Sequence, residues 1–159
     1  MAPKKAAPAP VEPVKSTGKF YYPGGGTYEG DWILQPPLPP VPGAPPPADP
    51  AAADKPKRLR DGKGHYIDGN YSYEGEWKND LMHGPGSFKY ASGASYEGTW
   101  ENGKYHGNGT FKWPDGRSYA GEWRENRMHG IGSYVDNEGH TWTGQFFNGA
   151  GPGLNCELT

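Results

Sequence analysis

Residues 96–118 read YEGTWENGKYHGNGTFKWPDGRS, and the pattern begins again at Tyr119. Five columns of this pattern keep a spacing of 23 residues along the chain. They hold the opening aromatics Tyr73, Tyr96, Tyr119 and Trp142; the glycines Gly75, Gly98, Gly121 and Gly144; the large aromatics Trp77, Trp100, Trp123 and Phe146; the histidines His83, His106 and His129; and the turn glycines Gly93, Gly116 and Gly139. A fixed period of this length indicates a chain built from stacked copies of one unit.

Each unit has the pattern of a β-hairpin. Aromatic residues and glycine alternate with polar residues over Tyr96–Trp100, and aromatic residues alternate with polar ones over Thr110–Trp113. This is the two-residue period of a strand. Asn102-Gly103 and Pro114–Gly116 are typical turn sequences. The sequence therefore predicts an all-β fold, an elongated single-layer meander of consecutive antiparallel hairpins in one open, twisted sheet.

Two glycine columns predict local backbone geometry. The column of Gly103 holds Asp80 and Asn126 in the neighbouring units, and these residue types tolerate a left-handed backbone. We therefore expect positive φ in this column. A strand glycine such as Gly98 needs another reason, because it lies between a tyrosine and a tryptophan. The missing side chain leaves room for a ring from the neighbouring strand to lie over the backbone.

Tyr-Glu-Gly-x-Trp followed by His-Gly-x-Gly, repeated every 23 residues, resembles the MORN repeat (membrane occupation and recognition nexus). The resemblance covers residues 62–149 well and residues 18–32 in part. It is specific, because one short motif recurs in register. It implies that the predicted hairpins are MORN hairpins.

Composition agrees with a thin sheet. Only 33% of the residues are hydrophobic, whereas 14% are aromatic and 26 of 159 are glycine. Such a chain suits aromatic packing between neighbouring hairpins better than a thick two-layer core. The sequence has no apolar run of membrane-spanning length and no apolar segment typical of a secretion signal after Met1. Cys156 is the single cysteine, which agrees with a reducing compartment.

Composition also divides the chain into five parts. We expect a disordered Ala/Pro/Lys tail at residues 1–17, a first partial unit at 18–34, a proline-rich insertion loop at 35–57, the repeat array at 58–149 and a C-terminal edge segment at 150–159, with a final edge strand over Leu154–Leu158. Lys4 and Lys5 are interpreted as part of a solvated tail; a targeting signal is the alternative.

The insertion holds ten of the 18 prolines and no aromatic residue. Its length equals one period, but without aromatics it does not read as a decayed repeat. We interpret it as a mobile, polyproline-like loop between two adjacent strands. A proline-rich ligand for a recognition domain is the alternative, although Pro39-Pro40 and Pro45–Pro47 lack basic neighbours.

The net charge of the first 60 residues differs in sign from that of the remaining 99. Residues 1–60 carry 8 basic and 5 acidic side chains, a net charge of +3, and residues 61–159 carry 8 basic and 13 acidic ones, a net charge of −5. An acidic array is a poor platform for nucleic acid or for anionic lipid. We therefore expect no nucleic-acid partner and no membrane association.

No residue cluster predicts catalysis, a metal site or a cofactor. Equivalent histidines in consecutive hairpins are two strands apart, about 9.6 Å, so they cannot share a zinc ion with ligands at about 2 Å. We expect each imidazole to close a turn through a hydrogen bond to nearby backbone. Asp80 and Asp115-Gly116 lack the dense oxygen ligands of a calcium loop. Cys156 has no histidine or acid at motif spacing, so it is not expected to be a nucleophile.

Recurring glutamates also have a structural interpretation. Two pairs of glutamates, Glu74 with Glu97 and Glu76 with Glu122, each repeat one column of the pattern. Both columns are expected on the face opposite the aromatics. We expect a solvated charged face there rather than acid–base chemistry. Lys89 and Lys112 lie on intervening strands and are expected to be cross-strand partners of these acids.

The aromatic ladder is the predicted partner-binding site. In a single-layer sheet part of this surface is expected to stay exposed as a groove, and an exposed aromatic stripe usually marks a protein contact. An amphipathic helix or a second repeat sheet would cover it. The predicted site consists of Tyr73, Tyr96, Tyr119, Trp142, Trp77, Trp100, Trp123 and Phe146.

These features predict a non-catalytic scaffold for protein–protein assembly. The resemblance further implies a structural component of the ciliary or flagellar axoneme, in a radial spoke or the central apparatus, and therefore a place in the cytoskeleton. The alternative that the family name suggests is a phosphoinositide or membrane-surface adaptor. Vesicle co-sedimentation separates the two functions, and the acidic array predicts no binding.

Overall fold

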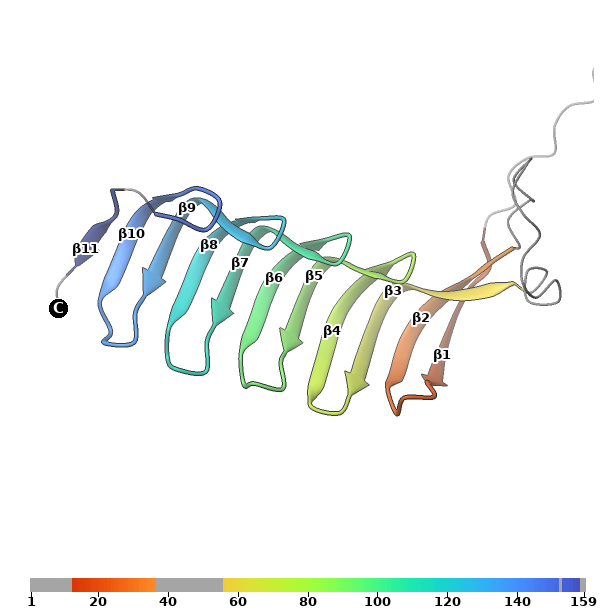
Figure 1. Cartoon of the computed structure of the whole chain (residues 1–159). Coiled ribbons are helices and arrows are strands. Elements are labelled where there is room, and N and C mark those ends of the chain that lie inside the picture. The colour runs from red at the N-terminus through yellow and green to blue at the C-terminus, as the bar shows by residue number, and fades with distance from the viewer. Residues whose placement is uncertain (1–12, 37–55, 152, 158–159) are drawn as a thin grey trace, which may run out of the picture.

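The protein forms a single sheet of antiparallel strands that follow one another in chain order (Figure 1). The computed structural model describes residues 13–36, 56–151 and 153–157. Within these ranges the 11 strands are β1 (Lys15–Tyr21), β2 (Thr27–Gln35), β3 (Lys57–Asp68), β4 (Tyr71–Lys78), β5 (Leu81–Lys89), β6 (Ser95–Glu101), β7 (Lys104–Lys112), β8 (Ser118–Arg124), β9 (Arg127–Val135), β10 (Thr141–Phe146) and β11 (Asn155–Glu157). The predicted all-β, single-layer meander is confirmed.

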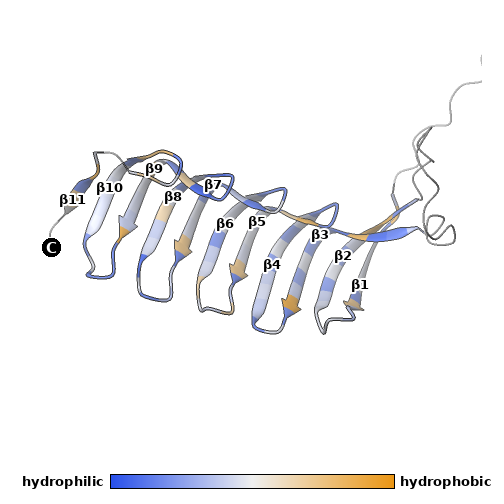
Figure 2. Ribbon diagram, viewed as in Figure 1, coloured by the Kyte–Doolittle hydropathy of each residue, from blue (hydrophilic) through white to orange (hydrophobic). Residues whose placement is uncertain are grey.

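Each strand pairs only with its neighbours in sequence, so the sheet grows along one axis and stays open at β1 and β11. Most of each strand is blue or nearly white in Figure 2, and orange is confined to short segments. This agrees with a core of tyrosine, tryptophan and glycine rather than aliphatic residues. No helix in the described ranges is long and apolar enough to cross a membrane.

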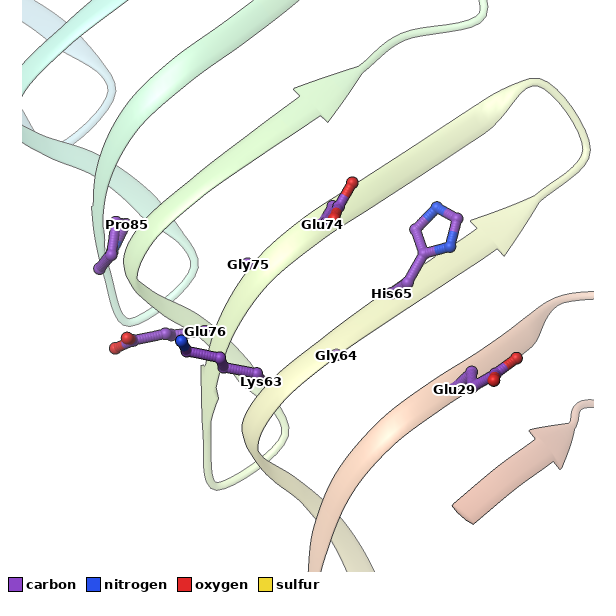
Figure 3. Close-up of a pocket in the computed structure, with 8 residues that line it drawn as sticks. All are labelled: Glu29, Lys63, Gly64, His65, Glu74, Gly75, Glu76 and Pro85. Atoms are coloured by element: carbon purple, nitrogen blue, oxygen red, sulfur yellow. The ribbon is translucent and has the colours of Figure 1, made fainter. Parts of the chain in front are cut away.

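A row of directly paired glycines crosses the sheet, one residue from each strand from β1 to β10. The row consists of Gly18, Gly30, Gly64, Gly75, Gly86, Gly98, Gly109, Gly121, Gly132 and Gly144. Beside this row the pairing changes register in four strand pairs, β2–β3, β4–β5, β6–β7 and β8–β9. Gly75 pairs with Gly86, but the next residue, Glu76, pairs with His83. The β4 ribbon curves beyond Gly75 at this point (Figure 3).

The tyrosines explain the glycine row. A Cβ added to Gly109 would clash with the phenol of Tyr96, which lies on the paired strand. The prediction for Gly98 is wrong in one respect, because the ring nearest to it is that of Tyr96 on its own strand and not a ring of the neighbouring strand. A Cβ added to Gly98 would lie 2.6 Å from the Asn108 carbonyl oxygen and 2.8 Å from the Tyr96 hydroxyl. From Gly30 to Gly132, a side chain in the row would therefore collide with a buried tyrosine or with the facing backbone.

The predicted left-handed column is also confirmed. Asp80, Gly103 and Asn126 have φ values of 73°, 78° and 68°. The residue before each one, as in Asn79 with φ of 49°, has positive φ as well. Positive φ at both central residues is what a type I′ hairpin turn requires.

The chain ends differ in detail from the predicted boundaries. β1 starts at Lys15, so residues 15–17 belong to a strand that pairs with β2 and are not part of the predicted tail. Residues 1–12 of the predicted tail and residues 37–55 of the insertion lie outside the described ranges. Gln35 and Lys57, the first and last residues of the predicted insertion, belong instead to β2 and β3 and pair with each other. β11 forms the C-terminal edge of the sheet beside β10.

Replacing Gly98 with alanine should lower the free energy of unfolding by about 1–3 kcal/mol, because the new methyl group overpacks the contact with Gly109 and Tyr96. Thermal unfolding followed by circular dichroism measures this loss. Gly24→Ala is the control, because a Cβ there meets nothing within 4 Å. Equal melting temperatures for the two variants would contradict the overpacking.

Replacing residues 36–56 with Asn-Gly should leave the sheet folded. Gln35 and Lys57 already face each other across β2 and β3, and Asn-Gly forms the two-residue turn used elsewhere in the array. Shortening the connection lowers the entropic cost of closing the loop by up to about 2 kcal/mol. The melting temperature should therefore stay equal or rise. Loss of the β signal in circular dichroism would show that the segment is needed for folding.

Candidate functional site

The predicted partner-binding rings form the core of the array instead of an open groove. Seven of the eight are buried, and Tyr73, Tyr96 and Tyr119 are 0% exposed. Trp142 alone among them is partly exposed. The expectation of an exposed groove lined by these rings is therefore wrong. The reason is that tryptophans from neighbouring units cover the tyrosines.

The buried rings interlock in a zigzag that crosses the boundaries between units. The Tyr96 ring meets Trp100 of its own unit edge to face at 5.1 Å and Trp123 of the next unit at 5.6 Å. Tyr73 lies in the same way between Trp77 and Trp100. Tyr119 lies between Trp123 of its own unit and Phe146 of the next. Each of these three tyrosines thus packs between two rings, and only one of them belongs to its own hairpin.

The polar atoms of these rings are satisfied inside the core. The Tyr96 hydroxyl donates to the Thr99 carbonyl at 2.9 Å, and Trp100 Nε1–H donates to the Gly86 carbonyl at 3.2 Å. The same bonds recur in the other units, from Tyr28, Tyr73 and Tyr119 and from Trp77 and Trp123. Burial raises the pKa of the Tyr119 phenol to about 12. The buried rings therefore offer a partner neither area nor free hydrogen-bonding groups.

A second set of rings lies on the same face and remains partly exposed. We call it the outer aromatic row, and it consists of Tyr66, Phe88, Tyr90, Phe111, Trp113 and Tyr134. Phe88 pairs with both Tyr73 and Tyr96, so these residues share one face. From Phe88 onward the rings form a continuous series, with centroids 4.4 to 6.1 Å apart. The alternation of Phe111 and Trp113 in the sequence was the signal for this row.

The opposite face carries the glutamate columns and a shallow cavity. Figure 3 shows Glu74 and His65 on one side of Gly64 and Gly75, and Lys63 and Glu76 on the other. The cavity holds about 640 Å³ and is lined by Glu29, Lys63, Gly64, His65, Glu74, Gly75, Glu76 and Pro85. It is open to solvent, and the glycine backbone forms its floor.

The predicted lysine partners of this acidic face are wrong. Lys89 pairs with Ser72 and Ser95, and Lys112 pairs with Ser95 and Ser118. Each lysine lies directly opposite serines because the glutamates occupy positions two residues farther along the strands. Glu74 and Glu97 face His65, Ser87 and Thr110 instead.

The three repeated histidines do not converge, and they do not close turns by bonding to backbone. His83 Nδ1 has no hydrogen-bond partner in the part of the chain that the structure describes. His106 Nδ1 lies 3.3 Å from a carboxylate oxygen of Glu101, and the His129 ring packs against Phe147. The glycine after each histidine has positive φ and makes the local change of direction. Across the described ranges, no three His, Cys, Asp or Glu side chains are placed to hold a metal ion.

The last unit departs from the pattern around Trp142. Its Nε1–H donates to Asp136 Oδ2 at 3.0 Å. Asp136 occupies the repeat position that holds an aromatic residue, such as Trp113, in earlier units. The backbone N–H groups of Glu138 and His140 also donate to Asp136. These bonds, that of Trp142 foremost, lower the pKa of the Asp136 carboxyl to about 2. Leu154 packs near Gly144 and against the end of the aromatic core.

Acid titration should release this last ring. The pKa of Asp136 is depressed from an ordinary value of 3.8 to about 2, so its contribution to stability is present above 3.8 and is lost as pH falls through about 2. The indole N–H signal of Trp142 in NMR spectra should shift with that midpoint, and Asp136→Asn should abolish the shift. The signals of Trp77, Trp100 and Trp123, which donate to carbonyls, serve as controls. A midpoint at or above 3.8 would contradict the bond.

Comparison with known families agrees with this geometry. Three consecutive segments, residues 73–95, 96–116 and 119–141, match the family described as MORN repeat. No curated protein matches the chain in a sequence comparison. The matched segments contain most of the interlocked rings and most of the outer aromatic row. Residues 73–141 are therefore three consecutive MORN repeats.

Proposed function

We propose that this protein is a non-catalytic repeat scaffold that assembles other proteins along the outer aromatic row. The observation that carries the proposal is a continuous row of partly exposed rings on top of a core that is already complete. Aromatic side chains dominate the binding energy at protein interfaces. The outer rings can bind a partner without any opening of the fold, because part of their area is already exposed.

The spacing of the row fits an amphipathic helix. Equivalent rings such as Phe88 and Phe111 are two strands apart, about 9.6 Å in a β-sheet. Residues seven positions apart on a helix are separated by about 10.5 Å along its axis. A helix that runs across the strands would thus present one apolar residue to each hairpin. A second repeat sheet of the same period would match the row as well.

We place this scaffold in the cytoskeleton of the cilium or flagellum, in a radial spoke or the central apparatus of the axoneme. This rests on the resemblance of the repeats, which within their family look most like MORN repeat-containing protein 2. The partners would be other subunits of an axonemal complex. A phosphoinositide or membrane adaptor is the competing function, and the net charge of −5 over residues 61–159 disfavours it.

Trp113→Ala tests the proposed surface. Trp113 is partly exposed and packs against Phe111 and Tyr134. Its replacement should weaken the binding of a partner by about 30-fold, as for a hot-spot residue, with little change in the melting temperature of the protein. Wild type, Trp113→Ala and the control Lys112→Ala should be compared in quantitative capture from axonemal extracts. Lys112 is the adjacent residue, exposed on the opposite face.

Subunits lost with Trp113→Ala and kept with Lys112→Ala are the expected partners, and titration of the purified subunit then gives the affinity. The proposal fails if the folded Trp113→Ala variant captures the same proteins as wild type. Sedimentation with phosphoinositide vesicles that persists at physiological salt would favour the membrane adaptor instead.

A further inference from the structure

Two arginines oppose each other at the turn that joins β8 to β9, on the upper edge of the sheet in Figure 1. Arg124 and Arg127 form the last pair before the two-residue turn. The equivalent pairs in the two preceding hairpins are Lys78 with Leu81 and Glu101 with Lys104. Like charges directly opposite on a sheet are destabilising. An anion between the two guanidinium groups would remove this repulsion.

The surroundings keep this positive charge free. Glu125 lies in the turn itself, but its carboxylate faces Lys104 at 3.9 Å. Arg127 donates a hydrogen bond to the side-chain oxygen of Asn148, which holds one guanidinium in place without neutralising it. Neither arginine forms an ion pair with any described residue. Three cations and one acid therefore meet at this edge.

The same residues line a cavity of about 620 Å³ together with an exposed ring. Its lining includes Lys104, Arg124, Glu125, Arg127, His129 and Phe147. The Phe147 ring is 67% exposed and packs against the His129 imidazole at 5.4 Å. A large apolar ring beside unpaired guanidinium groups provides both a charged and an apolar contact within one cavity.

We propose that this cavity binds an acidic segment of a partner protein, in which an apolar side chain stands next to the carboxylates. The planar guanidinium groups of Arg124 and Arg127 match carboxylates, and Phe147 packs on the apolar side chain. The surrounding array has a net charge of −5, which repels extended polyanions such as nucleic acid or an anionic membrane more than a short segment. The site is separate from the outer aromatic row, so it does not depend on the function proposed above.

The test uses the full chain and short fluorescein-labelled peptides built from glutamate with one leucine, phenylalanine or tryptophan at varied positions. Fluorescence anisotropy should show binding that weakens with salt. The double variant R124Q/R127Q should bind these peptides at least about tenfold more weakly than wild type, because charge-assisted hydrogen bonds are lost. Arg117→Gln is the matched control, since Arg117 lies beside Asp115 and Trp113 near the opposite edge. Phe147→Ser should weaken the peptides with an apolar residue and leave an all-glutamate peptide unchanged.

The melting temperature of R124Q/R127Q should be equal to or above that of wild type, because the substitution removes repulsion on an exposed turn. The proposal is overturned if no acidic peptide binds the wild type, or if R124Q/R127Q binds as tightly as Arg117→Gln. Binding to phosphatidylserine vesicles that needs both arginines, without peptide binding, would assign the site to a membrane and would also overturn it.

Discussion

Each of the four fully buried tyrosines, Tyr28, Tyr73, Tyr96 and Tyr119, lies against a pair of facing glycines, and the rest of the array depends on this contact. The Tyr96 ring occupies the space that side chains at Gly98 and Gly109 would need, and its hydroxyl bonds to the Thr99 carbonyl just beyond the row. The register change falls at the same point, so the strand bends around the ring it covers. One short motif therefore fixes the bend, the core and the spacing of the hairpins.

Most of the fold follows from the sequence because its signals are local. Alternation defines the strands, and Asp80, Gly103 and Asn126 mark the tight turns. The error at the candidate site came from a contact between units, because a repeat pattern does not reveal that Trp123 covers Tyr96. Exposure was therefore assigned to the largest rings, whereas Phe111 and Trp113 carry the accessible area. The lysine partners failed for a similar reason, since register and not proximity in sequence decides which residues face each other.

The array divides its tasks among separate surfaces. The inner rings hold neighbouring hairpins together, and the outer aromatic row lies on the same face but keeps area free. The opposite face is acidic around a floor of glycine backbone, and the turn between β8 and β9 gathers positive charge. The outer positions vary from unit to unit, as the column of Tyr90, Trp113 and Asp136 shows. Partner recognition can therefore differ along an otherwise uniform sheet.

The zigzag of rings has a consequence for synthesis of the chain. Tyr96 receives its second covering ring from Trp123, which leaves the ribosome one unit later. The newest hairpin is thus incomplete until its successor emerges, and assembly advances from the N-terminal end as a moving front. Beyond Phe146 the repeat pattern stops, and there Trp142 binds Asp136 while Leu154 packs against the aromatic core. A nascent array halted between units would carry one uncovered tyrosine at its growing end.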